Sequence, residues 1–403
     1  MRVLISTGEV SGDVAGALVA KEILRRDPAA HLFGIGGARL QQAGVDIAFS
    51  TIHLGTVGVS ESLAAIPALF QAIRIIRRRV ASDRPDVALL IGNDIFNVIL
   101  GRWLRARGIP TISWFPPQVW IWRSLAWLFT KSFDAVLASF PDEQRVYEKH
   151  CPATTFVGHY LADNLSPATP HERALARSKF GLHAEESVVA ILPGSRRQEL
   201  KTLIHHFLDA ASILAAERPV RFLLPVSDAC FQESIRTQIA RRGLSGRVTL
   251  VERDSHDVMR ASDVILTASG TATLEATLLG VPMVVAYRVS AVTLFIVRLA
   301  IRAGLMDAET TALPNLVLGR EAVTELKQRD VGPVRIAEAV KSLLDDGFAR
   351  RKTVRDLATA AAELRAHDSV GQVATIVLGR ASRDAHISPI RTAAGHQESL
   401  HES

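Results

Sequence analysis

Residues 265–288, ILTASGTATLEATLLGVPMVVAYR, place small and hydroxyl residues and one acid between two apolar runs. We predict a strand over 263–267 and a helix that begins near Ala272. The residues at the break are Ser269, Gly270, Thr271 and Ala272. The first N–H groups of a helix lack internal acceptors and carry a partial positive charge, so this break suits a phosphate or diphosphate.

The acid of this segment, Glu275, falls in or just past the first turn of the predicted helix. A carboxylate at that point can accept hydrogen bonds from two adjacent ribose hydroxyls, as acidic residues do in dinucleotide folds. An ordinary capped helix explains the same residues equally well, because Ser and Thr before an early Glu also favour a helix start. These residues alone leave both interpretations open.

A second loop with diphosphate chemistry is PGSRRQEL, residues 193–200, which follows another apolar run. Backbone amides and two adjacent arginines converge there, with Gly194, Ser195 and Arg196 at the centre. Exposed arginines on a helix face are the alternative. The Pro-Gly pair fixes the backbone just before the arginines and favours the binding interpretation.

Two loops nearer the N-terminus also carry polar groups after apolar runs. TGEVSGD, residues 7–13, is not a GxGxxG fingerprint, and a simple strand-to-helix turn explains it more often than a site does. Its candidate residues are Glu9, Ser11, Gly12 and Asp13. In IGNDIFNVIL, residues 91–100, the candidates are Asn93, Asp94 and Asn97; Asp94 is equally natural as a helix cap.

The elements that position these loops are short strand-like runs with helical patterns between them. Six runs lie between residues 2 and 158, a polar stretch follows from Asn164 to 186, and five more runs reach residue 287. This alternation predicts an α/β fold with two doubly wound, Rossmann-like domains that face a cleft. We expect one such domain over 1–165, a second over 166–345, a C-terminal helix over 346–380 that returns toward the first domain, and a disordered tail over 381–403.

Composition narrows the function classes. The 47 Lys and Arg against 41 Asp and Glu leave a net charge of +6, and most of the basic residues are Arg. That excess suits phosphate-bearing ligands or an anionic membrane, although a codon bias gives the same result. The basic residues form no stripe interleaved with aromatics, so nucleic-acid binding is not expected. Two distant cysteines, Cys151 and Cys230, suggest no disulfide or metal set and fit a reducing cytosol.

No apolar run is long enough for a membrane helix, since the longest candidate, from Ala291, is interrupted by Arg298 and Arg302. The N-terminus does not resemble a secretion signal. Residues 62–80 instead carry apolar side chains at helical spacing, including Leu69, Phe70 and Ile73, and end in four arginines. This pattern is typical of an interfacial helix, and a buried amphipathic helix with a basic end shows the same period.

Eight motifs in order, from residue 3 to about residue 364, together resemble the lipid-A-disaccharide synthase family. They are GEVSGD, GVSESL, FN at residues 96–97, VWIWR, VGHYLAD, LPGSR, ASGTATLE and LPNLVLGRE. The resemblance implies the two-domain GT-B architecture of nucleotide-sugar transferases, with 1–165 as the acceptor and membrane domain and 166–345 as the UDP-sugar-binding domain. It also implies that Arg196, residues 269–272, Glu275 and Asn315 contact UDP, and we expect Gly194, Ser195, Ser11, Gly12 and Asn97 to line the substrate site.

The family's chemistry is an inverting displacement on the cytoplasmic face of the inner membrane. The 6-hydroxyl of 2,3-diacylglucosamine 1-phosphate attacks the anomeric carbon of UDP-2,3-diacylglucosamine, giving the lipid A disaccharide and UDP. A carboxylate that takes the hydroxyl proton contributes about 10²- to 10⁴-fold. By this resemblance we expect no cofactor and no metal, and a peripheral membrane association; the oligomeric state, a homodimer included, stays open.

One departure from the family concerns its candidate general base. The family usually has an aspartate two residues before Pro-Asp-Phe-Asn, whereas this chain has Gly92 there and Ile95 at the second acid. Asp94 is then the nearest acid and the first candidate for the base, with Glu9 and Asp13 as further catalytic candidates. A UDP-sugar epimerase and a non-catalytic UDP-sugar-binding homologue remain the alternative functions.

Overall fold

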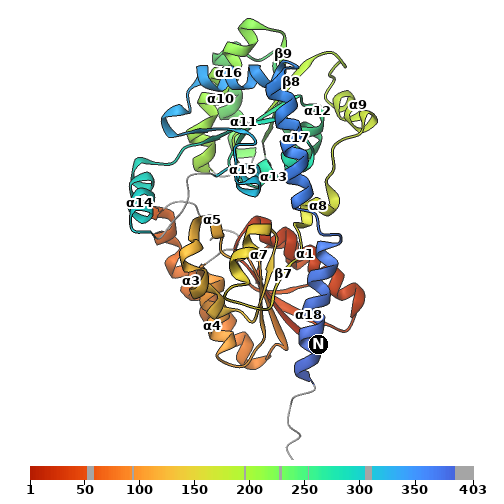
Figure 1. Cartoon of the computed structure of the whole chain (residues 1–403), viewed down its shortest axis with the longest axis vertical. Coiled ribbons are helices and arrows are strands. Elements are labelled where there is room, and N and C mark those ends of the chain that lie inside the picture. Colours follow the sequence, from red (N-terminus) through yellow and green to blue (C-terminus); the bar gives the residue numbers. More distant parts are fainter. Residues whose placement is uncertain are drawn as a thin grey trace, which may run out of the picture.

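The computed structural model describes residues 1–51, 59–92, 95–194, 197–226, 229–252, 254–304 and 311–385. Its elements form two α/β halves stacked along the long axis of the molecule (Figure 1). The fold class predicted from the sequence, two doubly wound sheets, is confirmed.

The first half is built on a seven-stranded sheet with the order β3-β2-β1-β4-β5-β6-β7, and every pairing in it is parallel. Its strands are β1 (Arg2–Thr7), β2 (His31–Gly36), β3 (Asp46–Ser50), β4 (Val87–Ile91), β5 (Thr111–Trp114), β6 (Ala135–Ala138) and β7 (Thr154–Phe156). The helices that follow them are α1 (Val10–Arg26), α2 (Ala38–Gln42), α3 (Val59–Ser82), α4 (Ile95–Arg105), α5 (Val119–Trp122), α6 (Ala126–Phe129), α7 (Pro141–Tyr147) and α8 (Tyr160–Asn164).

The second half repeats the plan with a six-stranded parallel sheet of order β10-β9-β8-β11-β12-β13. Its strands are β8 (Ser187–Leu192), β9 (Val220–Val226), β10 (Val248–Glu252), β11 (Val264–Ala268), β12 (Met283–Tyr287) and β13 (Thr324–Lys327). Its helices are α9 (Pro170–Lys179), α10 (Arg197–Glu217), α11 (Gln232–Arg241), α12 (Ser255–Ala261), α13 (Thr271–Leu278), α14 (Ala291–Arg302), α15 (Leu313–Leu318), α16 (Pro333–Leu344) and α17 (Phe348–Glu363).

Each sheet is buried on both faces, which is why its central strands are continuous apolar runs. In β1, Val3 and Ile5 pack toward α1, and Leu4 packs on the opposite face toward α3 and α4. In the second half, α10 and α16 cover one face, and α12, α13 and α17 cover the other. The last helix, α18 (Ser369–Ala385), leaves the second half and packs against α1, where Val373 and Val377 are fully buried. It continues five residues into the stretch expected to be disordered, and residues 386–403 lie outside the described residues.

Two segments, residues 159–165 and 364–369, cross between the halves, and hydrogen bonds join them to each other. The His159 N–H donates to the Leu364 carbonyl at 3.0 Å. Asp163 accepts from the Ser369 N–H at 2.8 Å, at the start of α18. Arg365 donates to the carbonyl of Ala162 at 3.2 Å. The two crossings therefore form one joint between the halves.

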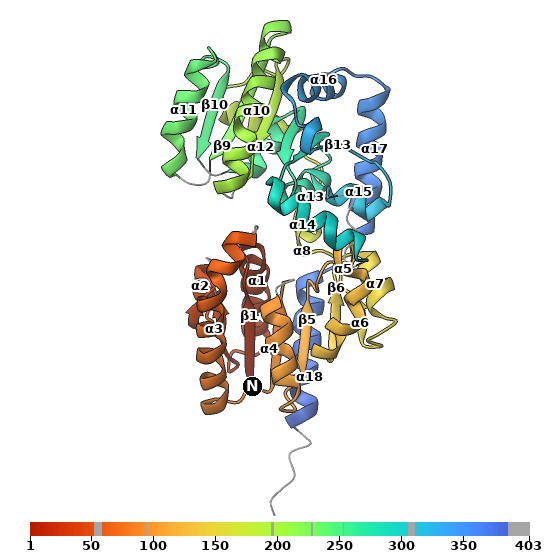
Figure 2. The ribbon, with the colours of Figure 1, turned by 90° about the vertical axis from the view of Figure 1, so that its left-hand side faces the viewer.

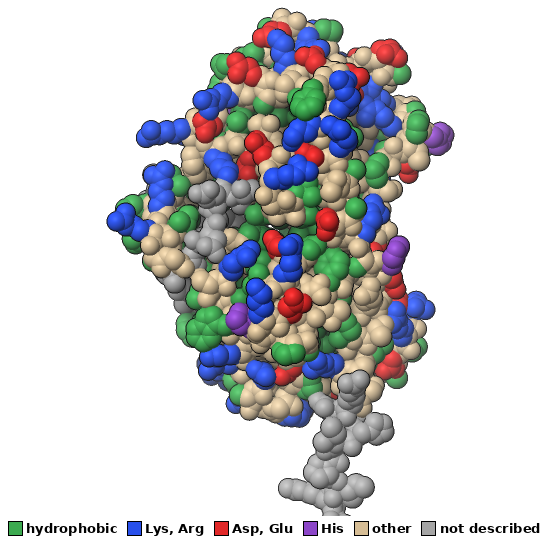
Figure 3. Space-filling model, in the orientation of Figure 1, with side chains coloured by type: hydrophobic (Ala, Val, Ile, Leu, Met, Phe, Trp, Pro, Cys, Tyr) green, Lys and Arg blue, Asp and Glu red, His purple; other side chains and the backbone are tan. Residues whose placement is uncertain are grey.

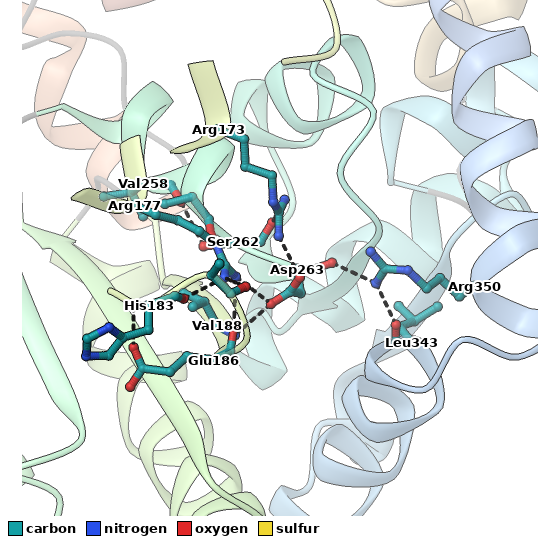
Figure 4. A network of polar contacts seen from close by, with 12 residues as sticks. Arg173, Arg177, His183, Glu186, Val188, Val258, Ser262, Asp263, Leu343 and Arg350 are labelled. Atoms are coloured by element: carbon teal, nitrogen blue, oxygen red, sulfur yellow. Dashed lines mark hydrogen bonds and ion pairs between the residues drawn. The ribbon is translucent and has the colours of Figure 1, made fainter. Parts of the chain in front are cut away.

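In the second half, the helices next to the two crossing segments, α9 and α17, both bond to Asp263, which directly precedes β11 (Figure 4). Its carboxylate pairs with Arg173 at 2.6 Å and with Arg177 at 3.0 Å, both on α9, and accepts from the Val188 N–H at 2.8 Å. Arg350 of α17 donates to the Asp263 carbonyl at 3.0 Å. Arg177 is buried, so this carboxylate compensates a buried charge at the amino end of the sheet, away from the loops that carry the predicted site.

Candidate active site

The predicted site loops follow four strands that meet at the switch points of the two sheets. In the first sheet the order reverses between β1 and β4, and in the second between β8 and β11. Ligands of doubly wound sheets bind at the carboxyl ends of the strands at such points. β1 rises from the N-terminus at the foot of the lower half toward the upper half, so its carboxyl end faces the second half (Figure 2).

The loop between β11 and α13 leaves its backbone accessible. Gly270 and Thr271 are exposed and Ala272 is partly exposed, while the Ser269 hydroxyl donates to the Thr311 carbonyl at 2.8 Å. Gly270 is the N-cap of α13, and its carbonyl accepts from the N–H and the hydroxyl of Thr273. The helix start thus presents its first backbone N–H groups, with their partial positive charge, at an exposed edge.

The neighbouring loop, after β8, is only partly described. Gly194 has a φ of +101°, a conformation that other residues adopt only with strain, so the chain turns sharply at the end of β8. Ser195 and Arg196 lie outside the described residues. Since β8 and β11 are adjacent and parallel, this loop and the start of α13 lie at the same edge of the sheet.

Glu275 lies one turn into α13 and has a partner that the sequence did not indicate. His256, the second residue of α12, places its Nε2 3.1 Å from Glu275 Oε1. The hydrogen bond to Glu275 raises the pKa of His256 above its usual value, against the opposing effect of burial. Burial raises the pKa of Tyr160; the charge of Glu275 raises it further, and that of Arg39 lowers it. Glu275 therefore lies within electrostatic reach of Tyr160 at the joint between the halves.

The β1–α1 loop differs from expectation at Asp13. This side chain is buried and accepts hydrogen bonds from three backbone N–H groups, those of Gly37 at 2.7 Å, Arg39 at 3.0 Å and Leu40 at 3.3 Å. Asp13 thus caps the start of α2, and this geometry does not support its predicted catalytic role. Gly12 packs against Thr7, whose Oγ1 would be 2.2 Å from an added Cβ, so Gly12 allows close packing of α1 on β1. Glu9 and Ser11 remain partly exposed at the start of α1.

Asn97 has a structural role that the sequence did not indicate, and its substrate contact stays a prediction. It is buried, its Oδ1 accepts from the Ser6 hydroxyl at 2.7 Å, and its Nδ2 donates to the Ile91 carbonyl at 2.9 Å. These bonds join the ends of β1 and β4 at the switch point. Asn93 and Asp94, in the same loop, lie outside the described residues.

Asn315 is a third predicted contact, and its side-chain amide already forms hydrogen bonds to the backbone. Its Oδ1 accepts from the N–H groups of Ala322 at 2.8 Å and Val323 at 2.9 Å, and its Nδ2 donates to the Val323 carbonyl at 3.0 Å. The side chain is buried and closes the turn between α15 and β13. The prediction that this amide contacts UDP is therefore not supported by the geometry.

An aromatic cluster covers the joint beside these loops. His159 packs against Phe115, Phe140 and Tyr160, with ring centroids 5.2, 5.7 and 5.0 Å away, and Trp120 packs edge-on against Phe140. Burial lowers the pKa of His159 to about 3, and its Nδ1 accepts from the Leu161 N–H. His159 is thus a neutral packing residue, and Trp120, which the sequence left unassigned, belongs to this cluster.

The comparison with known proteins decides the family. A family model described as lipid-A-disaccharide synthetase matches residues 3–377. The chain belongs to this family. The lipid-A-disaccharide synthase of Geobacter sulfurreducens is 36% identical over 379 residues, 94% of this chain and 96% of the relative. That of Pseudomonas aeruginosa PAO1 is 38% identical over 353 residues, 86% of this chain and 90% of the relative.

Solved structures agree with the GT-B fold. The UDP-N-acetylglucosamine 2-epimerase of Neisseria meningitidis bound to UDP-GlcNAc has a TM-score of 0.61 at 15% identity, covering 95% of this chain and all of that one. The calicheamicin glycosyltransferase CalG4 has a TM-score of 0.58 at 15% identity, covering 95% and 99%. Identities this low establish only the fold, whereas membership of the lipid-A-disaccharide synthetase family makes the chain a glycosyltransferase.

Proposed function

We propose that this chain joins UDP-2,3-diacylglucosamine to 2,3-diacylglucosamine 1-phosphate at the inner face of the cytoplasmic membrane. The acceptor's 6-oxygen attacks the anomeric carbon, the bond from that carbon to the diphosphate oxygen breaks, and UDP leaves with the electron pair. The hydroxyl proton passes to a carboxylate. The anomeric configuration is inverted in this single displacement.

The observation that carries the proposal is the set of groups at the switch point of the second sheet. The exposed start of α13 offers backbone N–H groups to a diphosphate, the β8–α10 loop carries Arg196, and Glu275 lies one turn into α13. Positive groups directed at the diphosphate stabilise the charge that accumulates on the leaving UDP. The described part of the chain holds no cluster of three or more residues able to bind a metal ion.

The general base belongs to the first half in this proposal. The Asp13 carboxylate already accepts from three backbone N–H groups, which leaves Asp94 and Glu9 among the predicted candidates. In the sequence, Asp94 follows β4, the strand next to β1 at the switch point of the first sheet. We assign it the base and give Glu9 the second place.

Two measurements test the proposed site. Purified protein with both acylated substrates should release UDP and the disaccharide, and calorimetry should show that Arg196→Ala and Glu275→Ala each weaken UDP binding by about tenfold or more. Glu217→Ala is the control, since this acid is exposed at the end of α10 and pairs with Lys341. Parent-like UDP affinity in both site variants, with the fold intact, would remove the nucleotide site from the second half.

We further propose that α3 and α14 rest together on the membrane surface. On α3, Phe70 is 69% exposed beside Arg74, Arg77 and Arg78, which line a shallow groove with it, while Ile76 is buried in the core. The buried Ile76 supports the core interpretation of 62–80, and the exposed Phe70 supports the interfacial one.

On α14, Phe295 and Leu299 are 68% and 58% exposed, beside the exposed Arg298 and Arg302. α14 lies on the same side of the molecule as α3 (Figures 1 and 2), and basic and hydrophobic side chains mix on the surface there (Figure 3). No helix among the described residues is long and apolar enough to cross a bilayer. Apolar side chains interleaved with arginines fit an interfacial contact with anionic lipids.

Vesicle co-sedimentation tests this surface. Phe70→Ser and the pair Phe295→Ser with Leu299→Ser should each reduce binding to phosphatidylglycerol vesicles, and salt should weaken the binding of the parent. Phe348→Ser is the matched control, because Phe348 is 71% exposed at the start of α17. If the control lowers binding as much as the α3 and α14 variants do, these two helices have no special role at the membrane.

A further inference from the structure

The contact between His256 and Glu275 joins two helices that are separate in sequence. His256 begins α12 and Glu275 lies in α13, and their side chains are 38% and 20% exposed. Glu275 is thus accessible enough to meet a ligand, and both groups are buried enough to hold a fixed geometry. An ionised carboxylate only accepts, so His256 Nε2–H is the donor of this 3.1 Å bond.

This bond leaves part of the Glu275 carboxylate available. Within the described part of the chain, His256 is the only hydrogen-bond partner of that carboxylate, and it contacts Oε1 alone. Oε2 and the remaining lone pair of Oε1 can therefore accept from two hydroxyls. A glutamate that no neighbour holds must lose the freedom of several side-chain rotations when it binds, which weakens binding.

The other charged groups around His256 have their own partners. On α12, Asp257 pairs with Arg260 at 3.3 Å, and Lys179 of α9 pairs with Asp257 at 2.7 Å and with Asp254 at 2.9 Å. At the joint between the halves, burial raises the pKa of Tyr160, the charge of Glu275 raises it further, and the charge of Arg39 lowers it. Among these groups, His256 is the one that fixes the Glu275 carboxylate by a direct bond.

We propose that His256 is a positioning residue for ribose recognition: its Nε2–H holds Glu275 Oε1, so that the carboxylate faces both hydroxyls of the UDP ribose before the nucleotide arrives. The inference rests on the proposed function, because it assigns the ribose to Glu275. It adds a residue that touches no substrate atom and acts through its neighbour. Its effect must therefore depend on the ribose hydroxyls.

A thermodynamic cycle with two nucleotides tests this dependence. Calorimetry compares UDP with 2′,3′-dideoxy-UDP, which lacks both hydroxyls, on the full-length parent and on His256→Ala. We expect His256→Ala to weaken UDP binding about fivefold to tenfold and to change the binding of the dideoxy nucleotide less than twofold. His256→Gln should stay close to the parent, since its amide N–H can reach the position of Nε2. A merely structural effect of His256 would weaken both nucleotides alike.

Lys179→Ala is the matched control, because it removes two ion pairs of the α12 region without touching the His256–Glu275 bond. It should leave the ratio of the two affinities unchanged. Equal losses for both nucleotides in His256→Ala, or a His256→Gln variant that behaves as His256→Ala does, would overturn the inference. Glu275→Ala separates the two proposals: if it binds UDP like the parent, the ribose assignment itself fails, whereas a Glu275 effect without a His256 effect refutes only the positioning role.

Discussion

Asp13→Asn distinguishes a cap from a catalytic group at the position where sequence and structure disagree most directly. The asparagine carbonyl can replace Oδ1 and keep the N–H groups of Gly37 and Leu40, but its amino group then faces the Arg39 N–H. One hydrogen bond to a carboxylate is lost, which costs about 1.5–3 kcal/mol, and the negative charge at the start of α2 is lost as well, which costs about 0.3–1 kcal/mol. We expect the first half to lose about 2–4 kcal/mol of stability.

Urea unfolding followed by tryptophan fluorescence measures this loss, because all five tryptophans lie between residues 103 and 127, in the first half. Asp46→Asn is the control: Asp46 is exposed and forms a surface pair with Arg79, so its loss should cost about 1 kcal/mol or less. Turnover of Asp13→Asn, measured where the protein is folded, should stay within about threefold of the parent. A turnover loss of about 10² or more with an unchanged unfolding midpoint would refute the cap and restore Asp13 as a catalytic group.

Three further predictions concern the base, a buried acid and the network at Asp263. Asp94→Asn should lower turnover by about 10² or more while UDP binding is unchanged; steady-state kinetics and calorimetry check this, and turnover within a few fold of the parent would pass the role to Glu9. Burial raises the pKa of Glu143 to about 8 from 4.5, so the folded state holds a proton that the unfolded state releases between these values. The free energy of unfolding should therefore fall as pH rises from 4.5 to 8, and Glu143→Gln, followed by tryptophan fluorescence, should remove most of that fall. Asp263→Ala leaves Arg177 buried without its carboxylate and should cost about 3–5 kcal/mol by urea unfolding followed by circular dichroism, whereas the surface variant Asp257→Ala should cost about 1 kcal/mol or less.

The central strands were predictable from sequence because both faces of each sheet are covered, which demands continuous apolar runs. The two strands that were missed, β3 and β13, are edge strands with partly exposed residues, and their sequences DIAFS and TELK carry no such run. An edge strand needs only one neighbour, so its sequence is less constrained. The loops of the site were predictable for the same reason as the central strands: ligand loops follow buried strands.

The roles of individual polar residues in those loops were not predictable. Asp13, Asn97 and Asn315 are residue types that bind ligands and also satisfy backbone groups, and only the folded chain shows which they do. Asn97 and Ser6 are 91 residues apart in sequence, and His256 and Glu275 are 19 apart. No local pattern signals such contacts. Arg196 and Asp94 lie outside the described residues, so their assignments stay predictions.

The departure at Gly92 has a physical consequence for the search for the base. Gly92 has a φ of +102°, and its N–H donates to the Trp114 carbonyl at 2.9 Å, so the chain turns here in a conformation that an aspartate would adopt only with strain. An aspartate at this position would therefore need a different turn. In the sequence, the next acid after Gly92 is Asp94, which precedes the buried Asn97 that joins β4 to β1. An acid only two residues after Gly92 in the sequence favours a displaced base over a lost reaction.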